Sequence, residues 1–231
     1  MPNLDTAYLT ARFQDQPAQT VVRSAIEDLF PARVALVSSF GTEAAVLLHM
    51  VALIDRHTPV IFLDTLKHFE ETLAYRDRLV DRLRLTDVRT VQPAGTEVAK
   101  TDPTGMLWAT DNDACCEMRK VRPLAEAIHR FGALITGRKR HHGSQRSALP
   151  VFEDDGVRLK VNPLARWDGD TVAQYMATHQ LPRHPLIDQG FPSVGCAVCT
   201  ARVQPGEDFR AGRWRGSGKT ECGIHFPPPP R

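Results

Sequence analysis

The sequence predicts an α/β fold, a parallel sheet with helices on both faces. Four short segments are expected to be strands, the apolar and buried runs at 34–37 and 60–63 and the segments at 88–91 and 133–136. Segments with the apolar spacing of a helix lie between or near them, at 43–55, 69–83 and 118–131. Strands that alternate with helices form parallel sheets covered on both faces, so this order defines the fold class.

The remaining segments are predicted to be less regular. Residues 92–114 show no clear period, which indicates a long loop, and Cys115 and Cys116 are expected to open the helix that follows. Residues 151–152 and 157–161 flank an acidic turn, as in a hairpin. Asp170 or Thr171 is expected to cap a helix that runs to about His179. From Leu181 onward, frequent Pro and Gly predict an irregular tail, and residues 227–231 are expected to be disordered.

Composition excludes several classes of protein. With 231 residues and 42% apolar content, the chain can bury a core without disulfides. Its 29 basic and 27 acidic residues are too balanced for a dedicated nucleic-acid binder, so no nucleic-acid partner is expected. The longest apolar stretch, 44–54, is well short of the ~20 residues of a membrane span. The first twenty residues lack the apolar core of a signal peptide, and the odd cysteine count fits a reducing cytosol, so we expect a cytoplasmic protein.

The turn after the first strand is a candidate anion site. It reads Ser38-Ser39-Phe40-Gly41-Thr42-Glu43 and leads into a helix, whose first N–H groups and dipole favour phosphate or sulfate. Asp64-Thr65 and Gly137-Arg138 stand at two further strand ends, where ligands of parallel sheets bind. An ordinary capped turn is the alternative. The loop matches neither the Walker A motif nor the dinucleotide glycine motif.

The five cysteines divide into four and one. Cys115, Cys116, Cys196 and Cys199 form two pairs that could hold zinc or an iron–sulfur cluster. Adjacent cysteines suit a single small ion poorly, which favours a [4Fe–4S] cluster. The alternative is a buried apolar Cys116 beside a Cys-x-x-Cys dithiol. Cys222 stands alone among Arg and Lys residues, and cations lower the pKa of a thiol, so it is a candidate nucleophile or else a spare surface cysteine.

Several motifs in this order resemble the sulfonucleotide reductase family, and within it the assimilatory adenylyl-sulfate reductases. The resemblance covers 34–225. Its motifs are Ser-Phe-Gly-x-Glu at 39–43, Leu-Asp-Thr at 63–65, Cys-Cys-x-x-Arg-Lys-Val at 115–121, Ile-Thr-Gly at 135–137, Pro-Ser-Val-Gly-Cys-x-x-Cys-Thr at 192–200 and Glu-Cys-Gly-Ile-His at 221–225. Each motif is weak alone, but together they are highly specific.

The resemblance implies an adenine nucleotide alpha hydrolase-like (PP-loop) fold with an irregular C-terminal tail. It assigns a [4Fe–4S] cluster to Cys115, Cys116, Cys196 and Cys199, and the nucleophile to Cys222. It implies that adenosine 5′-phosphosulfate lies against Ser38, Ser39, Phe40, Gly41, Thr42, Glu43, Leu63, Asp64 and Gly137, with its anion on Lys120, Arg146, Arg210, Arg213 and His225.

The resemblance also implies a reaction and its partners. Attack by Cys222 releases AMP and leaves a thiosulfonate, from which thioredoxin or a glutaredoxin-like reductant releases sulfite, as in assimilatory sulfate reduction and cysteine biosynthesis. We expect residues 1–205 to form the nucleotide-binding domain with the iron–sulfur site, and 206–231 a mobile tail that carries Cys222. A homo-oligomer is expected only by analogy.

Two departures from the family pattern leave alternatives open. Leu66 stands where relatives often have Gly, and Arg138-Lys139-Arg140-His141-His142 replaces an Arg-x-Asp-Gln type of segment. These basic residues could receive a 3′-phosphate, so a reductase for the 3′-phosphorylated substrate, or for both substrates, is the nearest alternative. A PP-loop tRNA-thiolating enzyme and a non-catalytic zinc module are the others, although the loop lacks the Asp-Ser end typical of the former.

Overall fold

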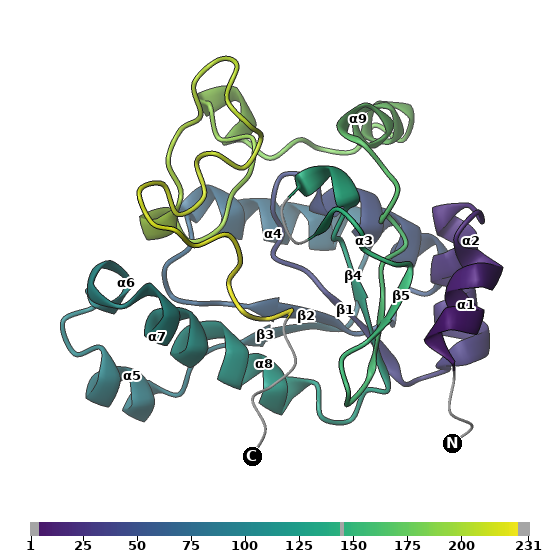
Figure 1. The fold of residues 1–231 in the computed structure, drawn as a ribbon, viewed down its shortest axis with the longest axis horizontal. Coiled ribbons are helices and arrows are strands. Elements are labelled where there is room, and N and C mark those ends of the chain that lie inside the picture. The colour runs from purple at the N-terminus through teal and green to yellow at the C-terminus, as the bar shows by residue number, and fades with distance from the viewer. Residues whose placement is uncertain (1–4, 144–145, 226–231) are drawn as a thin grey trace.

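Six strands form one sheet at the centre of the molecule (Figure 1). The computed structural model describes residues 5–143 and 146–225. The strands run in the order β3-β2-β1-β4-β6-β5, and all neighbours are parallel except β5 and β6. Their bounds are β1 Val34–Val37, β2 Val60–Leu63, β3 Val88–Val91, β4 Ala133–Thr136, β5 Phe152–Asp154 and β6 Leu159–Val161. The four predicted parallel strands are confirmed.

Nine α-helices and several tighter or wider turns lie within the described ranges. The helices are α1 Thr6–Phe13, α2 Ala18–Arg23, α3 Ala44–Ile54, α4 Glu70–Leu83, α5 Gly95–Thr101, α6 Leu107–Thr110, α7 Asn112–Cys116, α8 Arg122–Ala127 and α9 Gly169–Thr178. Ser24–Leu29 and Glu117–Val121 are π-helical, and Arg140–His142, Ile187–Gln189 and Ala197–Cys199 are 3₁₀ turns. None of the helices in these ranges combines the length and apolar composition that a bilayer crossing requires.

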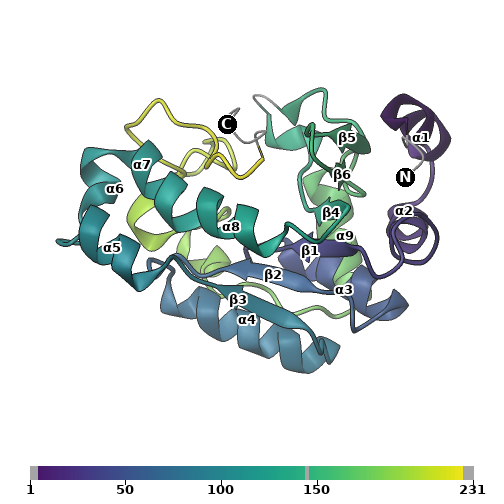
Figure 2. The same cartoon turned by 90° about the horizontal axis from the view of Figure 1, so that it is seen from below.

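The two faces of the sheet bury different sets of residues, because successive side chains of a strand point to opposite faces. Leu36 and Phe62 belong to a large core that α1, α2, α3, α4 and α9 cover. Ala35 and Ile61 belong to a smaller core on the other face, against α8 (Figure 2). Both faces of the sheet are therefore covered, as the fold class predicts.

The segment 92–114 is not the long loop that the sequence predicts. It contains α5, α6 and the start of α7. Buried Asp102 organises it, since its carboxylate accepts from the Leu107 N–H at 2.9 Å and pairs with Arg119 at 2.6 Å. Short helices without an amphipathic period give no sequence signal, and a buried ion pair between distant residues holds them in place.

The cysteine pair ends α7 and does not open it, so that prediction was wrong. Asp111 is the N-cap, and its Oδ1 accepts from the Ala114 N–H at 2.8 Å. The helix predicted at 118–131 is divided into a π-helical segment, α8 and a short loop. π-Helical turns inside helices often occur at functional sites.

The predicted hairpin and the last helix both form. β5 and β6 pair antiparallel, with Phe152 opposite Val161. The cap of α9 was placed two or three residues too late, because Asp168, and not Asp170 or Thr171, is the N-cap and accepts from the Thr171 N–H at 2.8 Å. Residues 227–231, predicted to be disordered, lie outside the described residues. From Leu181 to His225 the chain is irregular apart from the two 3₁₀ turns, as predicted.

Candidate active site

A cavity of about 210 Å³ lies over the carboxyl ends of β1 and β4. The chain leaves β1 toward β2 and β3 on one side, and β4 pairs with β1 on its other side. Such a reversal of strand order opens a crevice between the two connections, which is the usual ligand site of an open parallel sheet. Residues after both strands and residues of the C-terminal segment line this cavity.

The loop after β1 forms one wall of the cavity. Phe40 has a positive φ of 48° and is fully buried, with its ring edge-on to that of Phe62 at 5.5 Å. The Thr42 hydroxyl donates to the Pro192 carbonyl at 2.6 Å, which joins the loop to the C-terminal segment. A Cβ on Gly41 would lie 3.3 Å from Ser39 Oγ, so the loop is tight at this point. Ser38, Ser39, Gly41, Thr42 and Glu43 line the cavity.

Glu43 is held by two residues of the basic segment 138–142. Its Oε2 accepts from Lys139 Nζ at 2.8 Å and from His142 Nε2 at 3.0 Å. Burial opposes the charge of this carboxylate, but His142 and Lys139 outweigh it and lower its pKa to about 2. Arg138 in turn pairs with Glu153 and contacts Asn162. Arg138, Lys139 and His142 therefore already have carboxylate partners.

The five predicted anion contacts come together around the cavity, and all of them line it: Lys120, Arg146, Arg210, Arg213 and His225. Burial alone would lower the pKa of Lys120, but the neighbouring thiols of Cys196, Cys222 and Cys116 raise it. Burial lowers the pKa of Arg210 to about 10, with Arg213 and Arg146 adding to the effect.

His225 differs from the cation that the sequence suggests. Burial and the nearby charges of Arg138, Arg146 and Lys160 lower its pKa well below the ordinary value. A neutral imidazole can donate a hydrogen bond to an anion but adds no charge. The positive charge of the cavity therefore comes from Lys120 and the arginines.

Cys222 also lines this cavity, on the segment that returns from the surface to the sheet. Gly223 follows it with a φ of +90°, and a Cβ there would lie 3.2 Å from Val121 Cγ2. Ile224 packs against the smaller core beside α8. Ile224 therefore anchors the segment to the smaller core, and Cys222 lines the same cavity as Lys120 and Arg213.

The other four cysteines gather where α7, the end of β2 and the C-terminal segment meet. The Ala197 N–H donates to the Lys67 carbonyl at 2.7 Å, and Thr65 Oγ1 lies 3.2 Å from Cys196 Sγ. Burial, and after it the thiols of Cys116, Cys196 and Cys199, raise the pKa of Cys115 to about 11. The four thiols are thus electrostatic neighbours although 80 residues separate the two pairs.

The spacing of these sulfurs and the buried donors near them fit a cluster better than a single ion. Within the described residues, no three of the sulfurs lie within 4.8 Å of one another, whereas sulfurs about 2.3 Å from one zinc must do so. Arg119 Nε, Arg213 Nε and Trp214 Nε1 are buried without a hydrogen-bond partner there. Leaving an N–H unpaired costs about 1–3 kcal/mol, and the sulfurs of an iron–sulfur cluster accept such bonds.

Two predicted contacts do not line the cavity. The Phe40 side chain packs into the core, and Asp64 accepts from the Leu66 N–H at 3.0 Å and from Gln92 Nε2 at 2.8 Å. Leu63 and Gly137 do line it. Further lining residues were not predicted, among them His68, Ser193, Phe209, Trp214 and Glu221. Glu221 is part of the Glu-Cys-Gly-Ile-His motif, and that position is the one sequence signal that could have indicated it.

The family model for the phosphoadenosine phosphosulfate reductase domain matches residues 33–202. The chain belongs to this family. It is 54% identical to the adenosine 5′-phosphosulfate reductase of Mesorhizobium japonicum over 211 residues, which cover 91% of this chain and 83% of the relative. It is 37% identical to the phosphoadenosine 5′-phosphosulfate reductase of Gloeobacter violaceus over 94% of this chain and 92% of the relative.

Solved structures of this family and of more distant proteins share the fold. The crystal structure of phosphoadenylyl-sulfate reductase from Candida auris, a phosphate complex, matches with a TM-score of 0.73 and 28% identity, over 85% of this chain and 96% of that one. Yeast FAD synthetase matches with a TM-score of 0.55 and 14% identity, over 86% of this chain and 68% of that one. The second likeness concerns the fold alone.

Proposed function

We propose that this chain reduces adenosine 5′-phosphosulfate to sulfite and AMP, with thioredoxin as reductant and a thiosulfonate on Cys222 as intermediate. The observation that carries the proposal is that Cys222 and the cations Lys120, Arg146, Arg210 and Arg213 line one cavity at the strand-order reversal. The names of relatives that align over nine tenths of the chain support the substrate class.

The chemistry needs a thiolate and positive charge at one place. The Cys222 thiolate attacks the sulfuryl sulfur, the S–O bond to AMP breaks, and AMP leaves with that electron pair. A thioredoxin thiolate then attacks Cys222 Sγ, sulfite leaves with the S–S electron pair, and the second thioredoxin thiol resolves the mixed disulfide. The cations offset repulsion between thiolate and sulfate, and removing one such donor typically lowers the rate ~10²–10³-fold.

We further propose that Cys115, Cys116, Cys196 and Cys199 hold a [4Fe–4S] cluster, which the sulfur spacing and the unpaired N–H groups support. When bound, the cluster would supply acceptor sulfurs and, with its four thiolates, net negative charge beside Lys120. The reaction above takes its electrons from thioredoxin thiols. Such free thiols fit a reducing cytoplasm, where we place the protein, and movement of the tail from 206 to 225 would let Cys222 reach thioredoxin.

Carboxylates already bind three basic residues of the segment 138–142, and this favours the substrate without a 3′-phosphate. Lys139 and His142 share the Glu43 carboxylate, and Arg138 pairs with Glu153. A 3′-phosphate would have to compete with these carboxylates. We therefore expect adenosine 5′-phosphosulfate to be reduced faster than its 3′-phosphorylated form, which remains the alternative substrate.

The deciding experiment measures sulfite release by anaerobically purified protein with reduced thioredoxin and each of the two sulfonucleotides. We expect a strong preference for the unphosphorylated substrate. Cys222→Ser should release no sulfite but still bind the nucleotide in equilibrium dialysis. Normal turnover by Cys222→Ser would rule out the thiosulfonate, and no sulfite from either substrate with an intact cluster would rule out the reductase.

A further inference from the structure

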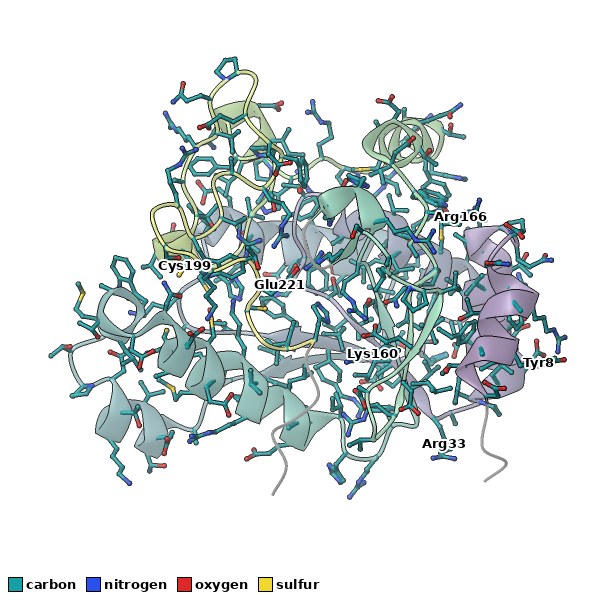
Figure 3. All side chains as sticks on the ribbon, viewed as in Figure 1. Tyr8, Arg33, Lys160, Arg166, Cys199 and Glu221 are labelled. Carbon is teal, nitrogen blue, oxygen red and sulfur yellow. The ribbon has the colours of Figure 1, made fainter. Side chains whose placement is uncertain are left out.

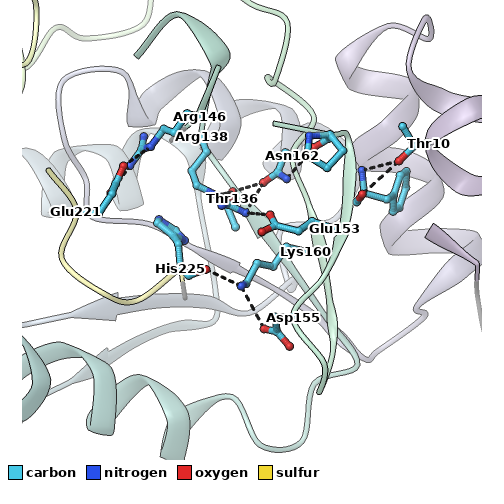
Figure 4. Close-up of polar contacts among 12 residues, drawn as sticks. Thr10, Thr136, Arg138, Arg146, Glu153, Asp155, Lys160, Asn162, Glu221 and His225 are labelled. Atoms are coloured by element: carbon cyan, nitrogen blue, oxygen red, sulfur yellow. Dashed lines mark hydrogen bonds and ion pairs between the residues drawn. The ribbon is translucent and has the colours of Figure 1, made fainter. Parts of the chain in front are cut away.

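The cavity contains an anion of its own, the side chain of Glu221. Among the residues that the structure describes, Glu43 and Glu221 are the two carboxylates that line it, and Glu43 is bound by Lys139 and His142. Glu221 binds Arg146 through both oxygens, Oε1 to Nε at 2.5 Å and Oε2 to Nη2 at 2.7 Å (Figure 4). Both side chains of this pair are 11% exposed.

This contact occupies the part of Arg146 that an oxyanion would use. The Nε–Nη2 edge of a guanidinium binds two oxygens of carboxylate, phosphate or sulfate with the same geometry. A third nitrogen, Nη1, lies 3.2 Å from His142 Nδ1. A substrate oxyanion can therefore bind the forked edge of Arg146 only when Glu221 has left it.

Glu221 precedes Cys222 directly, so its position is tied to that of the thiol. The segment 219–225 is held on either side by other contacts. Arg210 Nη2 donates to the Thr220 carbonyl at 3.1 Å, and Lys160 Nζ donates to the His225 carbonyl at 2.9 Å. Figure 3 shows Glu221 and Lys160 close to the centre of the molecule, where the C-terminal segment approaches the sheet.

We propose that Glu221 is an internal competitor for the substrate's oxyanion, one that binds Arg146 in the substrate-free enzyme and is displaced when substrate binds. Displacement couples substrate binding to a movement of the residue next to Cys222. When no substrate is present, Glu221 keeps a carboxylate on the Arg146 edge. The inference rests on the proposed function for the identity of the anion, but the competition itself concerns any sulfate or phosphate.

The test measures binding, with Cys222→Ser holoprotein as background so that no turnover occurs. Adenosine 5′-phosphosulfate and inorganic sulfate are titrated by calorimetry into this protein and into its Glu221→Gln and Glu221→Ala forms. Coupling between two sites typically changes affinity 5- to 150-fold. We expect the Kd of both ligands to be about 10-fold lower in the two Glu221 variants than in the background protein. Glu207→Gln is the matched control, because Glu207 also binds an arginine through both oxygens in the tail, Arg215, but does not line the cavity.

A double-mutant cycle separates competition at Arg146 from a general loss of negative charge. In an Arg146→Ala background, Glu221→Gln should leave the Kd unchanged, because the competed group is gone. Equal tightening with and without Arg146, or unchanged or weaker binding in both Glu221 variants, would overturn the inference. If no form binds the sulfonucleotide while Glu221→Gln still tightens sulfate binding, the proposed function fails and the competition stands.

Discussion

Two glycines of the C-terminal region lie where a single Cβ would collide, and the collisions differ in kind. A Cβ on Gly195 would lie 2.3 Å from Arg213 Nη2, whereas one on Gly212 would lie 2.1 Å from the Ala201 carbonyl oxygen. The Arg213 guanidinium can shift, but it would then leave its contacts with the Val194 carbonyl at 3.0 Å and the Trp214 ring at 4.6 Å. Gly195 thus protects the position of a cavity cation, and Gly212 protects the backbone.

Gly195→Ala should therefore reduce activity more than stability. We expect kcat/KM for sulfite release to fall at least ~10-fold, toward the ~10²–10³-fold of a lost transition-state donor. The midpoint of urea unfolding should change little. Gly169→Ala is the control, since no atom lies within 4 Å of its added Cβ. Full activity of Gly195→Ala would mean that the Arg213 position does not matter for the reaction.

Leu66, the position where relatives often have Gly, has a φ of 60° and is 51% exposed. A side chain in this left-handed region costs roughly 1–2 kcal/mol, and little packing is lost when it is removed. Leu66→Gly should raise the free energy of unfolding by up to ~1 kcal/mol, because glycine's greater freedom when unfolded offsets part of the relief. The control is Leu53→Gly, at an exposed position in α3, which should lower the free energy of unfolding by ~1 kcal/mol. A lower free energy of unfolding in both variants would mean that the Leu66 backbone is not strained.

Cys222 and Lys120, which line the cavity as expected, lie inside short motifs, whereas Arg146, Arg210 and Arg213 line it from outside them. Phe40 lies in such a motif too, yet its side chain supports the loop from the core side. Glu221 was missed as a cavity residue because its partner, Arg146, lies 75 residues away. A motif predicts that a residue matters, and only the folded chain shows what it touches.

At the scale of elements, the helix caps are the most direct link between sequence and the cysteine site. Asp111 caps α7, which carries Cys115 and Cys116, and Asp168 caps α9, which contains no cysteine. Their N-cap bonds are equally long, at 2.8 Å. The two caps therefore form a matched pair.

Asp111→Ala and Asp168→Ala should each lower the free energy of unfolding by about 1 kcal/mol, the usual contribution of an N-cap. Only Asp111→Ala should also speed the loss of visible absorbance when the loaded protein is exposed to air, because its helix positions two of the proposed ligands. Equal absorbance decay in both variants would mean that the cap of α7 does not help to keep the cysteine site intact.

Strands were predicted better than helices, and the reason is burial. Every residue of β2 and β4 is buried, so these strands appear as uninterrupted apolar runs with clear ends. α5 and α6 contain no buried residue, so neither has a periodic face that sequence reasoning could detect. The helices between Thr6 and Leu29 were not predicted, although Leu9 and Val22 are buried in the large core.

At the scale of the whole molecule, one buried histidine joins the irregular C-terminal segment to the helical layer. His184 is fully buried, 3.1 Å from Thr72 Oγ1 of α4, and its Nδ1 accepts from the Leu186 N–H at 3.2 Å. Burial lowers its pKa from 6.5 to about 4. The folded protein therefore keeps this imidazole neutral over a range in which the unfolded chain takes up a proton.

This contribution to stability is fully present above pH 6.5 and is lost as pH falls from 6.5 to 4, by up to about 3 kcal/mol. Urea unfolding at pH 7, 5.5 and 4 should show it. His184→Gln should be less stable at pH 7 and have a flatter profile, whereas His57→Gln, at an exposed position, should retain the wild-type slope. An unchanged slope in His184→Gln would assign the acid sensitivity to other groups.

The strand order has a consequence for how the chain reaches its native state. β1 lies at the middle of the sheet, yet its partners are β2, which follows soon after, and β4, since Val34 pairs with Ala133 about a hundred residues later. During synthesis the apolar edge of β1 on the β4 side stays unpaired until that distant segment has emerged, and unpaired strand edges promote aggregation. The same reversal of strand order that opens the crevice thus leaves the nascent chain with an aggregation-prone strand edge until β4 has been made.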